Sequence, residues 1–239
     1  MKQTLASFGL TALVGLSLLS ACGGDAEVEI AETETSSSGA EETSARRDDG
    51  VQIEGLMGSM DAEDVRYTME NKLGRFMRCF SRRYEDIEIL GGHIHMGFRV
   101  DIEGNVLWVY PTESSIGDRE TEKCLLETAA AIRFPRPRGG EAEFGYPLDL
   151  DPPEDVRPPV PWEESAIAST VEANRGSLAS CGAGYTVTVY VAPGGQVMAA
   201  GASTSEQTNA DGLDCVTDAV SRWSMPDPGS YPAKVSFSL

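Results

Sequence analysis

Residues 94–106 read IHMGFRVDIEGNV, and residues 185–197, further along the chain, read YTVTVYVAPGGQV. In both stretches apolar side chains alternate with other residues and then reach a Gly-x-Val turn, which is typical of a half-buried strand that enters a hairpin. The two stretches are 91 positions apart, as are Cys124 and Cys215. The motif therefore occurs twice, and each occurrence predicts a β-hairpin.

The match between the two parts of the chain extends beyond the hairpins. At the same offset and without a gap, Phe134-Pro135 aligns with Met225-Pro226. Upstream the offset grows to 102 positions, so that Cys79 aligns with Cys181, and the extra residues of the first copy fall within 81–92. We therefore interpret the chain as two diverged copies of one domain.

Each copy has the same expected order of elements. In the first copy, apolar residues at helical spacing predict a helix over 65–80 with Asp61 as its N-cap. A second helix follows Cys124 and ends at Pro135, and a closing strand follows over 142–148. In the second copy we expect a helix to Cys181, strands over 185–191 and 196–202, a helix over 212–223 and a strand over 232–239. The expected fold class is α+β: two tandem α-β-β-α-β units, each with two helices packed on a three-stranded antiparallel sheet and one disulfide.

The first cysteine, Cys22, ends the sequence Leu19-Ser20-Ala21-Cys22. It follows Lys2 and an apolar stretch over 5–19, which resembles the signal peptide and lipobox of a bacterial lipoprotein. This resemblance implies cleavage before Cys22, a diacylglycerol on its thiol, and a chain anchored to a lipid bilayer outside the cytoplasm. An ordinary secretory signal with a chance cysteine is the alternative, and it also exports the protein.

Four cysteines remain, and an even number in an oxidising compartment indicates two disulfides. Four cysteines permit three connectivities, and spacing alone does not choose among them. The repeat favours bridges within the copies, Cys79–Cys124 and Cys181–Cys215. The sequence has no Cys-x-x-Cys pair of the redox-active kind, so we expect both bridges to be structural.

The order helix, cysteine, hairpin, cysteine, helix, Phe-Pro and strand resembles the TonB-like C-terminal domain, in the form found in myxobacterial gliding-motility proteins of the AgmX/PglI type. The stretches that carry the resemblance are 65–80 with Arg78-Cys79-Phe80, 95–109, Lys123-Cys124-Leu125 and Ile132-Arg133-Phe134-Pro135. It covers 51–150 and, more weakly, 160–239. The resemblance implies a periplasmic module that grips a short extended segment of a partner along a sheet edge. No persistent membrane helix or long Pro/Lys-rich arm is expected, so binding is implied and energy transduction is not.

The expected organisation of the chain has five parts. They are a lipoprotein signal peptide (1–21), the lipidated Cys22 with a disordered acidic tether (22–50), a first TonB-like domain (51–150), a Pro-rich linker (151–164) and a second TonB-like domain (165–239). Residues 23–50 hold nine acidic residues but only Val28 and Ile30 as sizeable aliphatic residues. Such a segment cannot bury enough apolar surface to order itself.

The formal net charge of −19 argues against nucleic acid and anionic lipid as electrostatic partners. Basic residues nevertheless cluster along the first helix. They are Lys72, Arg75, Arg78, Arg82 and Arg83. We interpret this cluster either as a solvated face that nearby acids or the acidic tether partly balance, or as a docking patch for an acidic partner.

The two histidines, His93 and His95, have a spacing that places both rings on one face of a strand, within reach of one metal ion. Ile94 and Met96 define the core face, however, so we expect both rings in solvent, and we expect neither a metal nor a cofactor. The sequence also has no Gly-x-Ser-x-Gly elbow, no phosphate loop and no His-Glu-x-x-His motif. A non-enzymatic protein is therefore expected.

Two functions remain as hypotheses. The favoured one is a cell-envelope lipoprotein that binds an envelope protein or peptide through a free sheet edge or through the basic helix. Gly23, which follows Cys22 where some inner-membrane lipoproteins have aspartate, favours the outer membrane, with the chain facing the periplasm. The alternative is a structural scaffold or spacer lipoprotein without a discrete ligand.

Overall fold

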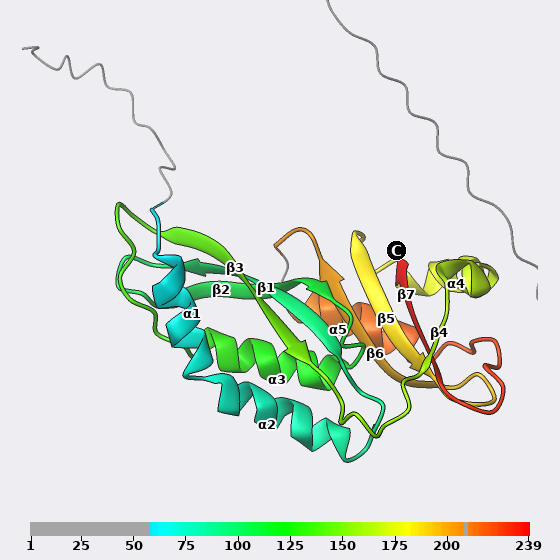
Figure 1. The fold of residues 1–239 in the computed structure, drawn as a ribbon. Coiled ribbons are helices and arrows are strands. Elements are labelled where there is room, and N and C mark those ends of the chain that lie inside the picture. The colour runs from blue at the N-terminus through cyan, green and yellow to red at the C-terminus, as the bar shows by residue number, and fades with distance from the viewer. Residues whose placement is uncertain (1–57, 208–209) are drawn as a thin grey trace, which may run out of the picture. The chain divides into compact units, whose positions relative to one another are not determined.

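The structure is a computed structural model, and it describes residues 58–207 and 210–239. These residues form a mixed α+β fold with five α-helices and two β-sheets, one of three strands and one of four (Figure 1). The α+β class predicted from the sequence is therefore confirmed. The signal peptide predicted for 1–21, and Cys22 with the tether predicted for 22–50, lie outside the described residues.

The first sheet is antiparallel and has the strand order β2-β1-β3. Its strands are β1 (Gly92–Val100), β2 (Val106–Ser114) and β3 (Ala142–Leu150). Side chains alternate across β1, so that Met96, Phe98 and Val100 are fully buried on one face. Phe98 stacks on Phe144 of β3 with 5.0 Å between the ring centroids. This face forms the core of the first half of the chain, residues 58–150.

Three helices belong to the first half: α1 (Ala62–Glu70), α2 (Leu73–Tyr84) and α3 (Arg119–Ala130). Helix α3 packs on β2, and α2 packs on α3 (Figure 1). Asp61 caps α1 as predicted, because its carboxylate accepts a hydrogen bond from the Glu63 N–H. Asp118 caps α3 in the same way by accepting from the Thr121 N–H.

The helix predicted as continuous over 65–80 is interrupted, so that prediction is wrong. Asn71 and Lys72 lie between α1 and α2, and the Lys72 N–H bonds to the Met69 carbonyl three residues back, which tightens the chain into a turn. The apolar face changes direction at this turn. Leu73 and Met77, two of the apolar residues on which the prediction of this helix rested, are therefore 44% and 38% exposed.

The second half of the chain, residues 160–239, contains four strands where three were expected. Antiparallel β6 (Val197–Thr204) and β7 (Ala233–Ser238) flank β5 (Tyr185–Val191), and β4 (Val160–Pro161) pairs in parallel with β7. The Val160 N–H donates to the Pro232 carbonyl and the Trp162 N–H to the Lys234 carbonyl, each at 2.9 Å. Part of the predicted Pro-rich linker is therefore a strand of the sheet.

The helical segments of the second half are η1 (Glu164–Ala166), α4 (Ala168–Asn174), η2 (Arg175–Leu178) and α5 (Ala210–Val220). The prediction of one helix leading to Cys181 is wrong, because the chain passes from α-helix to 3₁₀-helix at Asn174. Glycine and serine follow there, and both are weaker helix formers than alanine or leucine. The Ser177 hydroxyl also donates to the Asn174 carbonyl at 2.7 Å, in competition with the helical ladder.

The turns that begin β2 and β6 have the same hydrogen bonds. In the first half the Asp101 N–H donates to the Asn105 carbonyl and the Phe134 N–H to the Gly104 carbonyl, at 2.9 and 2.8 Å. At positions 91 residues later, the Ala192 N–H donates to the Gln196 carbonyl and the Met225 N–H to the Gly195 carbonyl, at 2.8 and 2.9 Å. Gly104 and Gly195 both have positive φ, +87° and +82°. Each of these turns holds the chain that follows a helix against the hairpin.

Replacing Gly104 with alanine is expected to lower the free energy of unfolding by about 2–3 kcal/mol, because the new Cβ would collide with the Phe134 carbonyl oxygen and φ is positive. Gly139→Ala is the matched control, since Gly139 also has positive φ, +83°, but a Cβ there meets no atom within 4 Å. Urea unfolding of both variants would separate backbone strain from the collision. Equal losses would contradict a role for the Phe134 contact.

The two halves contact each other at a junction, formed by Gly91, Ser114 and Glu122 from the first half and Thr188, Tyr190, Ala202 and Lys234 from the second. Tyr190 is fully buried in the core of the first half. Its hydroxyl donates to the Gly91 carbonyl at 2.9 Å and accepts from the Gly91 N–H at 3.1 Å. Lys234 Nζ also donates to that carbonyl, at 2.6 Å. Burial lowers the pKa of Lys234 to about 8 and raises that of Tyr190 to about 12.

Candidate functional site

Strand β3 is an open edge of the first sheet. The His93 carbonyl accepts from the Ser115 N–H next to β2, so the backbone groups of odd-numbered β1 residues point toward β2. Even-numbered β1 residues therefore bond to β3, where the register pairs Phe98 with Phe144 without a shift. The backbone groups of Glu143, Gly145, Pro147 and Asp149 must then point away from the sheet. In the part of the chain that the structure describes, these four residues have no strand partner on that side.

The other sheet edges are covered or very short. Strand β2 lies against β6. On β6 itself, the Ala202 N–H donates to the carboxylate of Glu122 at 3.0 Å, which occupies one of the outward groups of that edge. Strand β4 has two residues. Among the described strands, β3 is thus the long edge that a further strand can join.

A groove runs beside this edge, between β3 and α1. We call it the edge groove; its volume is about 560 Å³ and it is lined by Gly58, Ser59, Met60, Ala62, Val65, Arg66 and residues 143–147. Met60, Phe144 and Tyr146 are half-buried and give it an apolar floor. Arg66 and Glu143 supply charges at its rim. Burial raises the pKa of Tyr146.

One end of the edge already pairs with the chain. Ser59 and Arg138 bond to each other through both backbone groups, at 2.9 Å each, and the Gly58 N–H donates to the Glu141 carbonyl at 2.6 Å. Glu141 is odd-numbered, and its outward carbonyl agrees with the direction inferred above for the odd-numbered residues of β3. A strand partner on the edge is therefore geometrically feasible, since two residues of this chain already bond there.

The predicted basic cluster divides into two groups in the structure. Arg83 does not contribute to a free surface, because its guanidinium bonds to both carboxylate oxygens of the buried Asp118, at 2.9 and 3.1 Å. The hydrogen bond to Asp118 raises the pKa of Arg83. A bidentate pair of this kind fixes the end of α2 to the start of α3. Lys72 precedes α2 and is half-buried.

The other three members, Arg75, Arg78 and Arg82, border a second groove between α2 and α3. We call it the arginine groove; its volume is about 330 Å³, and Cys79, Cys124, Glu127, Thr128 and Ala131 complete its lining. All three arginines are exposed. Within residues 58–207 and 210–239, none of the three forms an ion pair or a side-chain hydrogen bond. The structure thus brings three of the five predicted residues together.

Glu122 is a buried carboxyl group that the sequence reasoning missed. It is fully buried on α3, where it accepts from the Ser114 hydroxyl at 2.6 Å and from the Ala202 N–H at 3.0 Å. Desolvation raises its pKa to about 7, although both hydrogen bonds favour the ionised form. A sequence signal did exist: Glu122 precedes Leu125 by three positions and Ala129 by seven, which places it on the apolar face of the helix.

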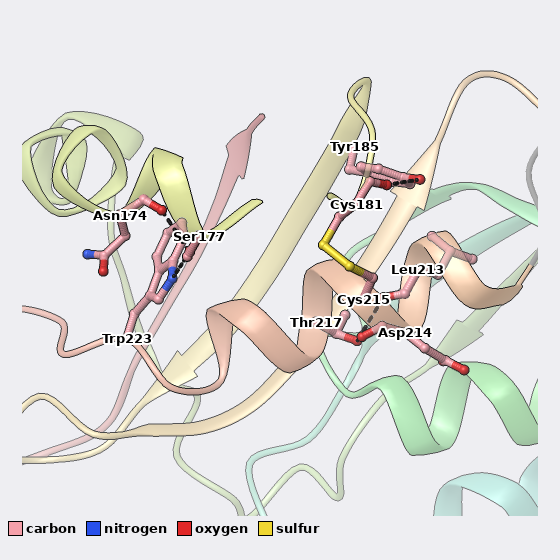
Figure 2. The surroundings of a disulfide bond; sticks show 9 residues. All are labelled: Asn174, Ser177, Cys181, Tyr185, Leu213, Asp214, Cys215, Thr217 and Trp223. Carbon is pink, nitrogen blue, oxygen red and sulfur yellow. Dashed lines mark hydrogen bonds between the residues drawn. A yellow bond between two sulfur atoms is a disulfide. The ribbon is translucent and has the colours of Figure 1, made fainter. Parts of the chain in front are cut away.

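The four cysteines form the bridges Cys79–Cys124 and Cys181–Cys215, which is the pairing expected from the repeat. Figure 2 shows the second bridge, which joins the segment after η2 to α5. Beside it the Tyr185 hydroxyl donates to the Cys181 carbonyl at 3.1 Å, and Trp223 Nε1 donates to the Ser177 hydroxyl at 3.2 Å. Cys79–Cys124 joins α2 to α3, and Cys181–Cys215 joins the residues after η2 to α5.

The histidines lie on the face of β1 away from the core; His93 is exposed, as expected, but His95 is half-buried, so the expectation that both rings lie in solvent is wrong for His95. His93 Nδ1 is 2.8 Å from the Ser115 hydroxyl and His95 Nδ1 is 2.7 Å from the Thr112 hydroxyl. Among the described residues there is no group of three or more His, Cys, Asp or Glu side chains that could hold a metal ion. No helix within these residues is long and apolar enough to span a membrane.

Comparisons of this chain with protein-family models, with curated proteins and with solved structures find no match.

Proposed function

We propose that this chain is a non-enzymatic cell-envelope lipoprotein that binds an extended segment of another envelope protein along the open edge of β3. The TonB-like resemblance supplies the mode of binding, which is addition of a strand to a sheet. The edge groove supplies a place for it. The observation that carries the proposal is the row of outward backbone groups on β3, which lies next to an apolar groove of about 560 Å³.

The proposal includes an origin by tandem duplication of an α-β-β-α-β unit. The matching turns at Gly104 and Gly195 support it, because four equivalent hydrogen bonds at one constant offset are hard to obtain by chance. The two disulfides support it as well, since each joins the first helical segment of its half, or the residues just after it, to the helix that follows the hairpin. The second half then differs by its added strand β4 and by the 3₁₀-helix η2 in its first helical segment.

The proposed location is the periplasmic face of the outer membrane, with the lipid on Cys22 as anchor. This part of the proposal rests on the lipobox-like sequence, on Gly23 and on the two disulfides, which are typical of proteins outside the cytoplasm.

A proline at Glu143 is expected to abolish partner binding while the fold survives. Proline has no N–H to donate to an added strand, and its ring would obstruct the approach of that strand. The hydrogen bonds between β3 and β1 would remain, because they come from the even-numbered residues of β3. A photo-reactive residue at Arg66, on the α1 wall of the groove, would capture the partner in the native envelope. Capture is expected to fall at least about tenfold in Glu143→Pro, because one backbone hydrogen bond to the partner is lost and the partner strand packs less closely beside the proline.

Three controls make the result specific. Glu143→Ala removes the same side chain, including its 3.4 Å contact with Arg99, but keeps the N–H, and it is expected to bind normally. A photo-reactive residue at Glu113, exposed on β2, should capture nothing comparable. Melting temperatures of all variants would show that the fold is kept.

Equal capture in the proline and alanine variants would exclude strand addition at β3. A complete lack of captured protein at Arg66 would instead favour the scaffold function. The junction favours the scaffold function. Tyr190 and Glu122 join the two halves through buried hydrogen bonds, and a spacer needs its parts to be held rigidly together.

A further inference from the structure

The arginine groove is a local concentration of positive charge on an acidic protein. The chain carries a formal net charge of −19, yet Arg75, Arg78 and Arg82 lie together on one exposed helix face. The nearest acidic side chain that lines the groove, Glu127, belongs to the opposite wall and forms no ion pair with them within the described residues. Three guanidinium groups with free donors therefore face a hollow whose floor is the Cys79–Cys124 bridge.

The second half provides an internal comparison. In the alignment of the copies, the positions of Arg75 and Arg78 correspond to Ser177 and Ser180, and Glu127 corresponds to Asp218. Figure 2 shows Ser177, Trp223 and Asp214 near the second bridge. Asp214 is itself paired with Arg119, at 2.7 Å. Serines therefore stand in the second half at the positions that Arg75 and Arg78 occupy in the first.

We propose that the arginine groove binds an acidic, extended segment of a partner protein, with carboxylates on alternate residues. Along a helix, successive residues rise about 1.5 Å, so the three arginines are spaced at roughly 4.5 and 6 Å. Alternate side chains on one side of an extended peptide are about 6.6 Å apart, close to the roughly 6 Å between Arg78 and Arg82. Guanidinium groups suit carboxylates because their donors form a fork. Glu127 on the far wall selects a hydroxyl or amide donor on the other side of the segment.

Net charge favours a peptide over an anionic membrane surface. Exposed charges are screened beyond about 8 Å at physiological ionic strength, so a short segment in the groove interacts mainly with the three arginines. An anionic lipid surface is larger than the groove, so the net negative charge of the protein would repel it. The arginine groove is separate from the edge groove, so this inference does not depend on strand addition at β3.

The test is a titration of the full chain with a labelled hexapeptide, Glu-Ser-Glu-Ser-Glu-Ser, blocked at both ends and followed by fluorescence anisotropy. The double variant Arg78→Gln/Arg82→Gln is expected to bind about tenfold more weakly, which corresponds to two exposed ion pairs. Arg136→Gln/Arg138→Gln is the matched control, because it removes the same charge from exposed arginines outside the groove, and it is expected to change binding less than twofold. A peptide with the same composition but contiguous glutamates should bind more weakly than the alternating one.

Three outcomes would overturn the proposal. They are equal losses in the two double variants, which would mean a response to net charge alone; no binding of the alternating peptide to the unmodified chain; and binding to vesicles that contain anionic phospholipid but not to the peptide. Melting temperatures of both double variants would confirm that each is folded, since none of these arginines forms an ion pair in the described residues.

Discussion

Replacing Cys181 and Cys215 together with alanine is expected to lower the free energy of unfolding by about 4 kcal/mol. The bridge joins residues 34 positions apart, and the unfolded chain regains the freedom of that loop when the bridge is absent. The equivalent change at Cys79 and Cys124, 45 positions apart, is expected to cost a similar amount. Losing both would remove about 8 kcal/mol, which is comparable to the whole net stability of many proteins.

Urea unfolding of the two double variants and of the four-cysteine variant would measure these losses. A reductant should lower the unfolding midpoint of the natural chain but leave that of the four-cysteine variant unchanged. Losses below about 1 kcal/mol for each bridge would contradict a stabilising role and would imply that the helices hold their positions by packing alone.

Glu122 is expected to make the chain less stable as the pH rises from 4.5 to 7. Its ordinary pKa of 4.5 applies in the unfolded chain, whereas the folded chain holds it at about 7. In that window the folded protein keeps a proton that the unfolded chain has lost, so the free energy of unfolding falls with rising pH. The shift corresponds to about 3 kcal/mol, lost fully only above pH 7.

Glu122→Gln is expected to remove this dependence and to be more stable than the natural chain above pH 7. The glutamine amide retains an oxygen for the Ala202 N–H and can donate to the Ser114 hydroxyl, while it carries no charge to desolvate. Glu127→Gln, at an exposed position on the same helix, is the control and should follow the natural profile. Parallel profiles for the natural chain and Glu122→Gln would refute the assignment. Lys234 acts at higher pH, where its lowered pKa makes stability rise between about 8 and 10.5.

Local patterns were sufficient to predict every described strand except β4, and the N-cap of α1. The alternation of Met96, Phe98 and Val100 places one strand face in the core, and the structure buries all three. Asp61 was predicted as an N-cap from its position before an apolar helix, and it caps α1. The cysteine pairing followed from the repeat, because equivalent positions in two copies reduce three possible connectivities to one. Each of these signals depends on residues close in sequence or on a comparison of the chain with itself.

The incorrect and missing predictions concern contacts between distant residues. The spacing from Val65 to Phe80 suits one helix, and nothing local shows that it bends at Asn71. Arg83 resembled its neighbours in the basic cluster until the fold placed Asp118 against it, 35 positions later. One partner of Glu122 is a backbone group, 80 positions away in the second half, and backbone groups leave no sequence signal. The β4 strand forms where the proline-rich stretch pairs with β7, more than 70 positions later in the chain, and nothing near Val160 in the sequence indicates that pairing.

Pro147 on the open edge of β3 has a consequence for self-association. A sheet edge with an unbroken row of donors is a template on which identical chains can stack into fibrils. Pro147 interrupts the row two residues after Gly145, so a second copy cannot extend the hydrogen-bond ladder along the whole strand. The edge therefore remains accessible to a short guest over residues 143–145, while growth of a continuous intermolecular sheet stops at the proline.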